Sequence, residues 1–101
     1  MFHEPPTEAQ VAERLGLDPS DARLPGIREA ALLVQSRVCE VDPFDAGLYE
    51  AALRRAAFLF SSMPHTLGVL DTGTDYGVQY LPLYHPDWDA LEVGRRKIVV
   101  A

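Results

Sequence analysis

The stretch DPFDAGLYEAALRRAAFLFSSM, from Asp42 to Met63, constrains the fold of this chain more than any other part. Its apolar residues recur every three or four positions, which is the period of an amphipathic helix. The stripe that they form is too wide for a single partner helix. We therefore expect this helix to be the centre of the domain, or to have one flank covered by another copy of the protein. The stripe consists of Phe44, Leu48, Ala52, Ala56, Leu59 and Met63, widened by Tyr49, Leu53, Ala57 and Phe60.

A polar cap and two prolines predict where this helix begins and ends. Asp42 can cap the first turn, and Pro43 suits the first helical position because a missing amide costs nothing there. Pro64 disfavours helical geometry at the residue before it, so the helix should end near Met63.

Two further helices are predicted before this one. Thr7, followed three residues later by Gln10, is a capping box that starts a short helix, and Gly16 can close that helix in a left-handed conformation. The connection LDPSDARLPG is rich in turn-forming residues. After it, apolar residues at helical spacing predict an amphipathic helix from Ile27 to Val41.

The character of the sequence changes after Pro64. Glycines punctuate short pieces rich in Val, Leu, Tyr and Thr, which predicts a hairpin or an irregular strand pair over residues 66–84. Residues 78–84 are the best strand candidate, and the proline among them favours an edge position. A short helix over residues 86–93 and an extended tail over residues 94–101 are expected to follow.

Length and composition predict a single soluble domain over residues 1–101. Hydrophobic residues make up 48% and charged residues 24%, as in ordinary globular proteins. The expected fold class is mainly α, with a small bundle of three helices in residues 7–63 followed by the β element, the short helix and the tail. No apolar run reaches the roughly 20 residues that cross a bilayer. The N-terminus lacks the pattern of a signal peptide, so we expect a protein kept inside the cell, with no membrane partner.

The charge of the chain is −6 and unevenly distributed. Residues 1–94 carry six basic and fifteen acidic side chains, a balance of −9, and Arg95, Arg96 and Lys97 add three positive charges. Such an acidic body repels nucleic acid backbones. If an electrostatic contact exists, the RRKIVVA tail is its expected location.

Neither cysteine nor histidine points to a reactive centre. Cys39 is the single cysteine and falls in the apolar pattern of a helix, which predicts a buried, inert thiol. The three histidines share no spacing typical of a zinc site. We therefore expect no metal, no cofactor and no catalytic residue.

The triplet Asp71-Thr72-Gly73 raises one enzymatic alternative, a homodimeric aspartic protease in which each subunit lends one aspartate to a shared pair. That fold is nearly all β, with the aspartate loop early in the chain. Here a largely helical pattern precedes Asp71, and only 30 residues follow it. The triplet is better explained as a polar turn, since Asp, Thr and Gly favour turns.

A second alternative is a small DNA-binding regulator, because VAERLG is similar to the start of a helix-turn-helix motif. In that motif a short turn leads directly to a basic recognition helix. In this chain ten loop residues with two prolines intervene, and the body is acidic.

The tail RRKIVVA carries apolar residues that are an aggregation hazard if they stay exposed. Two arrangements remove the hazard. The tail can fold back as a last strand of its own domain, or it can serve as an arm that adds to a sheet edge of a neighbouring molecule. The sequence leaves both open.

The order of these features resembles a known family. VAERLG, a loop, a long helix, YEAALRRAAFLF, a Gly-Val step, DYGV, HPDWDAL and a closing GRRKIVVA are similar to the small head-to-tail connector, or adaptor, proteins of long-tailed bacteriophages. The likeness spans most of residues 8–101. One departure is the helix end FLFSSMPHT, where this family leads us to expect more arginines.

The resemblance implies a non-enzymatic virion protein at the head-tail junction, made in the cytoplasm of the bacterial host. It is expected to form a ring of twelve copies between the portal protein and the next connector or tail-completion protein, with DNA passing through without sequence-specific binding. On this reading three sets of residues make contacts. The subunit interface uses Ala51, Arg54, Arg55 and Phe58; the portal or tail contact uses Asp71, Thr72, Asp75, Tyr76, Tyr80 and Tyr84; the docking arm uses Arg95, Arg96, Lys97, Ile98, Val99 and Val100.

Overall fold

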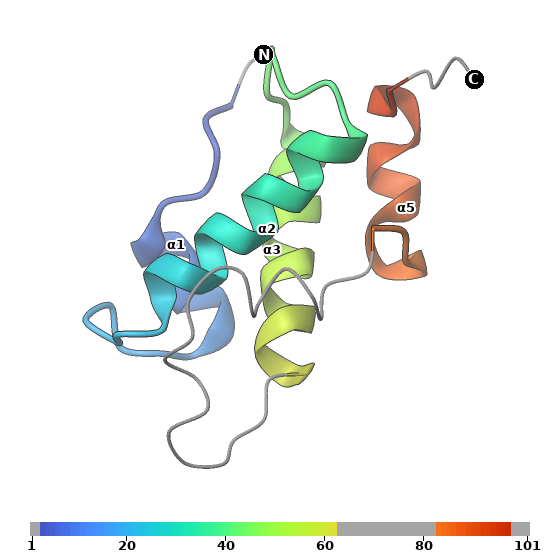
Figure 1. Cartoon of the computed structure of the whole chain (residues 1–101). Helices are drawn as coiled ribbons and strands as arrows, with labels where there is room; N and C mark the ends of the chain where they lie inside the picture. Colours follow the sequence, from blue (N-terminus) through green and yellow to red (C-terminus); the bar gives the residue numbers. More distant parts are fainter. Residues whose placement is uncertain (1–2, 63–82, 98–101) are drawn as a thin grey trace.

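The computed structural model describes residues 3–62 and 83–97, and in them the chain is helical (Figure 1). These residues contain four α-helices and no strand, which confirms a mainly α fold. None of the helices in this part is long and apolar enough to span a membrane. The elements are α1 (Glu8–Leu15), α2 (Leu24–Val38), α3 (Ala46–Ser62), α5 (Pro86–Glu92) and the short 3-10 helix η2 (Val93–Arg95).

Helix α3 is the central element, as one of the two sequence expectations had it. It contacts α1, α2 and α5, and Figure 1 shows α2 crossing in front of it, with α5 standing along its side. The part of the wide apolar stripe that the structure describes is therefore covered largely by helices of the same chain. The buried core includes Leu24, Ile27, Ala30, Ala31, Val34, Leu48, Ala51, Ala52, Leu53, Ala56, Leu59 and Trp88.

Helix α1 begins and ends as its sequence predicts. The amide of Gln10 donates to Thr7 Oγ1 at 3.2 Å, and the amide of Thr7 donates to Gln10 Oε1 at 2.9 Å. This capping box satisfies two amides that a new helix leaves without partners. Gly16 closes the helix at φ 73°, a left-handed conformation that favours glycine.

Helix α2 is displaced from its predicted range of Ile27 to Val41. It begins at Leu24, because Pro25 in the first turn needs no amide partner. It ends at Val38, and Cys39 is extended with φ −126°. Cys39 forms an antiparallel bridge with Arg96, so a contact with a distant segment stops the helix. The thiol is buried as predicted, but it does not lie in a helix.

The predicted start of α3 at Asp42 and Pro43 is wrong. The helix begins at Ala46, and Asp45 caps it, accepting from the amide of Leu48 at 2.9 Å. The bond from Asp42 to Pro43 is cis. Phe44 is only 8% exposed and packs in the core ahead of the helix. Local propensity could not distinguish the two aspartates, because either can cap a helix.

The short C-terminal helix is confirmed as α5, and His85 caps it by accepting from the amide of Asp87 at 3.1 Å. The tail does not begin as predicted, because Gly94 and Arg95 belong to η2. Extended backbone starts at Arg96. Most of the predicted β element over 66–84 lies outside the described residues, and Leu83 and Tyr84 at its end are not in a strand.

Candidate interaction surfaces

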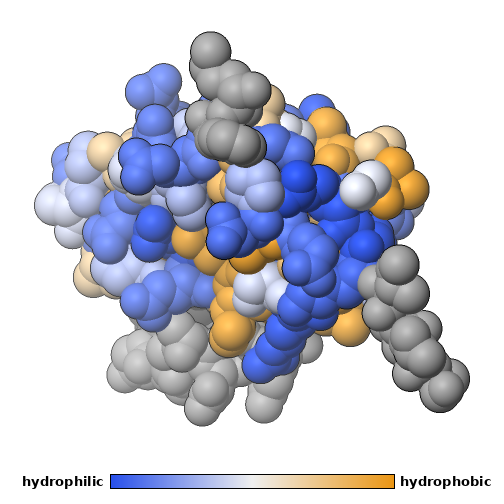
Figure 2. All heavy atoms as spheres, turned by 90° about the horizontal axis from the view of Figure 1, so that it is seen from above, coloured by the Kyte–Doolittle hydropathy of each residue, from blue (hydrophilic) through white to orange (hydrophobic). Residues whose placement is uncertain are grey.

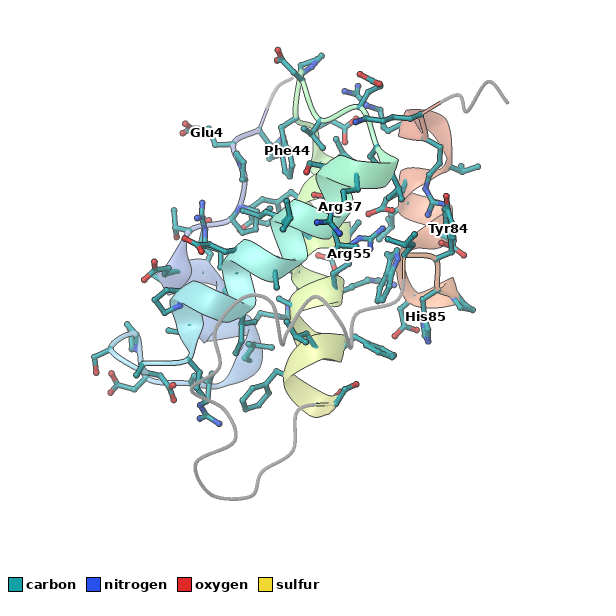
Figure 3. All side chains as sticks on the ribbon, viewed as in Figure 1. Glu4, Arg37, Phe44, Arg55, Tyr84 and His85 are labelled. Carbon is teal, nitrogen blue, oxygen red and sulfur yellow. The ribbon has the colours of Figure 1, made fainter. Side chains whose placement is uncertain are left out.

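A buried ion pair joins α3 to α5. Arg55 Nη2 lies 2.6 Å from Glu92 Oε1, and Arg55 Nε donates to Glu92 Oε2 at 2.9 Å. Both side chains are 0% exposed. Figure 3 shows Arg55 lying between the two helices. This two-bond geometry is the strong form of a carboxylate–guanidinium contact, and it pairs the two buried charges directly.

Polar and aromatic groups complete the surroundings of this pair. Gln35 Nε2 donates to Leu48 O at 2.9 Å and to Glu92 Oε2 at 3.1 Å. The Arg55 guanidinium lies 4.7 Å from the ring centroid of Trp88. We call Gln35, Arg55 and Glu92 the polar clamp. Because its charges compensate each other inside the core, the clamp holds α2, α3 and α5 together.

The three cationic residues of the predicted arm contact their own chain, Arg95 and Arg96 through their side chains and Lys97 through its backbone amide. Arg96 Nη2 donates to Asp89 Oδ1 at 2.7 Å, and this contact lowers the pKa of Asp89. The Arg95 guanidinium donates to the carbonyls of Glu40 and Pro43. The amide of Lys97 donates to Val38 O at 2.9 Å. We call Arg95, Arg96 and Lys97 the C-terminal anchor, since they fix this segment beside the end of α2.

A groove of about 800 Å³ lies between the N-terminal segment, the second half of α2 and the α2–α3 connection. Its lining is mostly apolar, and the carboxylates of Glu4 and Asp42 stand at its edge, both exposed. Figure 2 looks down on the end of the molecule that carries this connection, and shows apolar surface in the middle of a polar border. The lining residues are His3, Glu4, Pro5, Leu32, Gln35, Ser36, Val41, Asp42, Pro43 and Phe44.

The predicted subunit interface divides into two buried and two accessible residues. Ala51 and Arg55 are 0% exposed and lie in the core of their own chain, so their assignment to a free flank of the helix is wrong. Arg54 is exposed and donates to Glu50 and to the carbonyl of Asp87. Phe58 is half-buried and packs edge-on against Trp88. An interface role for Arg54 and Phe58 stays a prediction.

Of the predicted portal or tail contacts, only Tyr84 is in the described part of the chain. It is 56% exposed, and the Arg96 guanidinium lies 4.6 Å from its ring centroid. The other members of that set lie outside the described residues, together with the apolar end of the predicted arm. These are Asp71, Thr72, Asp75, Tyr76, Tyr80, Ile98, Val99 and Val100.

The polar clamp and the groove are the features that sequence reasoning missed. A signal for the clamp existed: Arg55 sits between Ala51 and Leu59, four residues away on either side in the apolar stripe, so its charge required a buried partner. Glu92 as that partner was not deducible, because it is far away in the sequence. The groove had no local signal, since it combines residues 3–5 with residues from α2 and the following connection.

Glu50 ties α1 to α3 and gives a pH-dependent prediction. Arg14 donates to both of its carboxylate oxygens, at 2.7 and 2.9 Å, and this contact, aided by Arg54, lowers the pKa of Glu50 to about 2. The ionised form is therefore the stabilising one. Its contribution is complete above pH 4.5, the ordinary pKa, and disappears as the pH falls through about 2.

We expect Glu50→Gln to lower the free energy of unfolding by less than about 1 kcal/mol at pH 7, because the pair is partly exposed and screened by solvent. At pH 2 the difference from the parent protein should shrink. Urea unfolding of both proteins at the two pH values measures this. An unchanged difference at pH 2 contradicts the role of the ion pair.

No protein-family model, no curated protein and no solved structure matches this chain. Its function is therefore inferred from its own residues and their arrangement.

Proposed function

We propose that this chain is a structural, non-enzymatic assembly protein, and specifically a ring component that connects the phage head to the tail. The order of features from VAERLG to GRRKIVVA supports this family, as set out from the sequence. The structural observation that carries the proposal is the C-terminal anchor. It holds the start of an apolar segment in a fixed position at the edge of the helical body.

The anchor supports the docking-arm role for a mechanical reason. A segment that captures a neighbour loses less conformational entropy on binding if its base is already fixed. Arg95 and Arg96 supply that base through intrachain contacts. The proposal therefore assigns docking to Ile98, Val99 and Val100, while two of the three cations work within the chain.

The charge of the protein suits a ring through which DNA moves. A net charge of −6 disfavours the tight phosphate contacts that exposed cations make, so a DNA chain can slide past such a wall. The proposed partners are other copies of the chain, a portal protein and the next connector or tail protein. We place it at the head-tail junction of the virion, after synthesis in the host cytoplasm.

The two alternative functions receive less support. Helices α1, α2 and α3 precede Asp71, whereas the protease fold requires strands there. For a DNA reader, eight residues separate α1 from α2, which is longer than the turn of a helix-turn-helix motif. Arg28, on the candidate recognition helix, donates to the carbonyl of Pro6.

The solution mass of the full chain and of a version that ends at Lys97 tests the proposal. We expect the full chain to form twelve-subunit rings, alone or with the portal protein of the same phage, as measured by light scattering and electron microscopy. The shortened chain should keep its fold, because the anchor is retained, and should lose assembly. A stable dimer in both versions, with no response to portal, contradicts the connector function.

A further inference from the structure

The groove and the C-terminal anchor lie on different sides of α2. Leu32, Gln35 and Ser36 line the groove. The anchored residues follow directly from α5 and η2, and Figure 3 shows Arg37 on the front face of α2, with Glu4 and Phe44 above that helix. Two different surfaces of one molecule are therefore available, which is the requirement for a head-to-tail contact between identical subunits.

The two sides carry opposite charges, and these charges are not paired within the described part of the chain. Glu4 and Asp42 at the groove are exposed, and so are Arg37 and Lys97 on the other side. None of the four side chains makes a hydrogen bond or an ion pair with another described residue. A second copy can bring Arg37 and Lys97 to the acidic edge, and this pairing favours one orientation over others.

The groove also offers places for an apolar peptide segment. Leu32 and Val41 are partly buried, and each leaves apolar surface along the groove. Gln35 lines it as well, and its Oε1 is a buried acceptor with no partner among the described residues. Gln35 is itself 0% exposed, so what a bound segment would supply to the groove is side chains that cover its apolar lining.

The chain end of the same molecule is directed away from its own groove. Glu40 N donates to Arg95 O and Lys97 N donates to Val38 O, so the two segments run antiparallel. From Arg95 to Lys97 the chain therefore runs from Glu40 toward Val38, away from Val41, which lines the groove. This direction favours a second molecule as the source of the bound segment.

The geometry points to one occupant: the groove of one copy binds the segment from Lys97 to Val100 of a second copy. This inference rests on the proposed ring function and names the contact that closes the ring. Lys97 and Arg37 of the second copy face Glu4 and Asp42. The apolar side chains at 98–100 enter the groove, and repetition of this contact builds a ring if the rotation between copies closes.

A disulfide cross-link between two full-length variants tests the contact directly. Ser36→Cys, placed in the groove, is mixed with a tagged Val100→Cys chain and oxidised. We expect a covalent heterodimer. Leu33→Cys, exposed on the same helix and outside the groove, is the matched control and should give at least about tenfold less product. Cys39 is 0% exposed, and burial raises its pKa to about 11, so the native thiol competes poorly with the two introduced cysteines.

A groove variant measures the same contact without new thiols. Val41→Glu places a charge in the groove and should weaken self-association at least about tenfold, the effect of losing one buried aliphatic contact. Leu33→Gln, exposed and outside the groove, should leave association unchanged. Equal loss in both variants, or equal cross-linking at positions 33 and 36, overturns the inference.

The outcomes separate this inference from the proposed function. If the chain forms rings without the Ser36–Val100 cross-link, the docking contact is wrong and the ring function stands. If the cross-link forms but assembly stops at pairs or open chains, the contact stands and the ring function fails. An intramolecular cross-link alone, in a chain carrying both cysteines, shows that the segment binds its own groove and overturns the inference.

Discussion

Arg55→Met should lower the free energy of unfolding by about 3 kcal/mol, because it leaves Glu92 as a fully buried carboxylate without its main partner. Breaking a buried ion pair costs about 3–5 kcal/mol in other proteins. We expect the lower end of that range, since Arg96 Nη2 remains 3.1 Å from Glu92 Oε1. Urea unfolding followed by circular dichroism at pH 7 measures the loss.

Two controls make this result specific to the buried pair. Arg54→Met removes the neighbouring charge at a side chain that is 48% exposed, and should cost less than about 1 kcal/mol. The double variant Arg55→Met with Glu92→Met should recover about half of the loss or more, because a buried pair replaced by apolar groups is often neutral. A single variant as stable as the parent contradicts the clamp.

Trp88→Ala should cost about 3–5 kcal/mol, the range for removing a large aromatic side chain from a core. Trp88 is 0% exposed, lies edge-on to Phe58 at 5.6 Å and donates from Nε1 to Leu83 O at 3.3 Å. Its loss opens a cavity where α5 meets α3. Because it is the only tryptophan, unfolding is best followed by circular dichroism.

Trp88→Phe is the matched control for this cavity. It keeps an aromatic ring in the core and loses the indole donor, so its cost should be clearly smaller than that of the alanine variant. Val93→Ala, at a side chain 73% exposed in η2, should change stability by less than about 0.5 kcal/mol. Equal costs for the Ala and Phe variants would show that the indole hydrogen bond, and not packing, carries the contribution of Trp88.

Much of the secondary structure could be predicted from local sequence rules. The Thr7–Gln10 capping box, the left-handed Gly16 and the Pro86 start of α5 each depend on residues within one helical turn. The helix boundaries that were predicted wrongly could not be settled by local rules. Helix α2 ends where Cys39 forms a backbone bridge with the distant Arg96. Helix α3 is capped by Asp45, although Asp42 carried an equivalent local signal.

The candidate surfaces were harder to predict from the sequence than the fold was. The sequence pointed to RRKIVVA as a contact segment, but not to the binding of Arg95 and Arg96 within the chain. It assigned Ala51 and Arg55 to a free flank because periodicity gives the width of a helix face and not the identity of what covers it. The covering element is α5, whose contact with α3 joins residues more than thirty positions apart.

By itself the sequence determined that this chain forms a small, acidic, mainly α domain with a wide-faced central helix, because composition and helical periodicity act over short distances. Only the tertiary structure decided that α5 covers that helix, that Arg55 pairs with Glu92, and that a groove opens beside α2. Those features depend on which distant segments lie together. A buried charge or an apolar groove acquires its partners through packing, which no local pattern encodes.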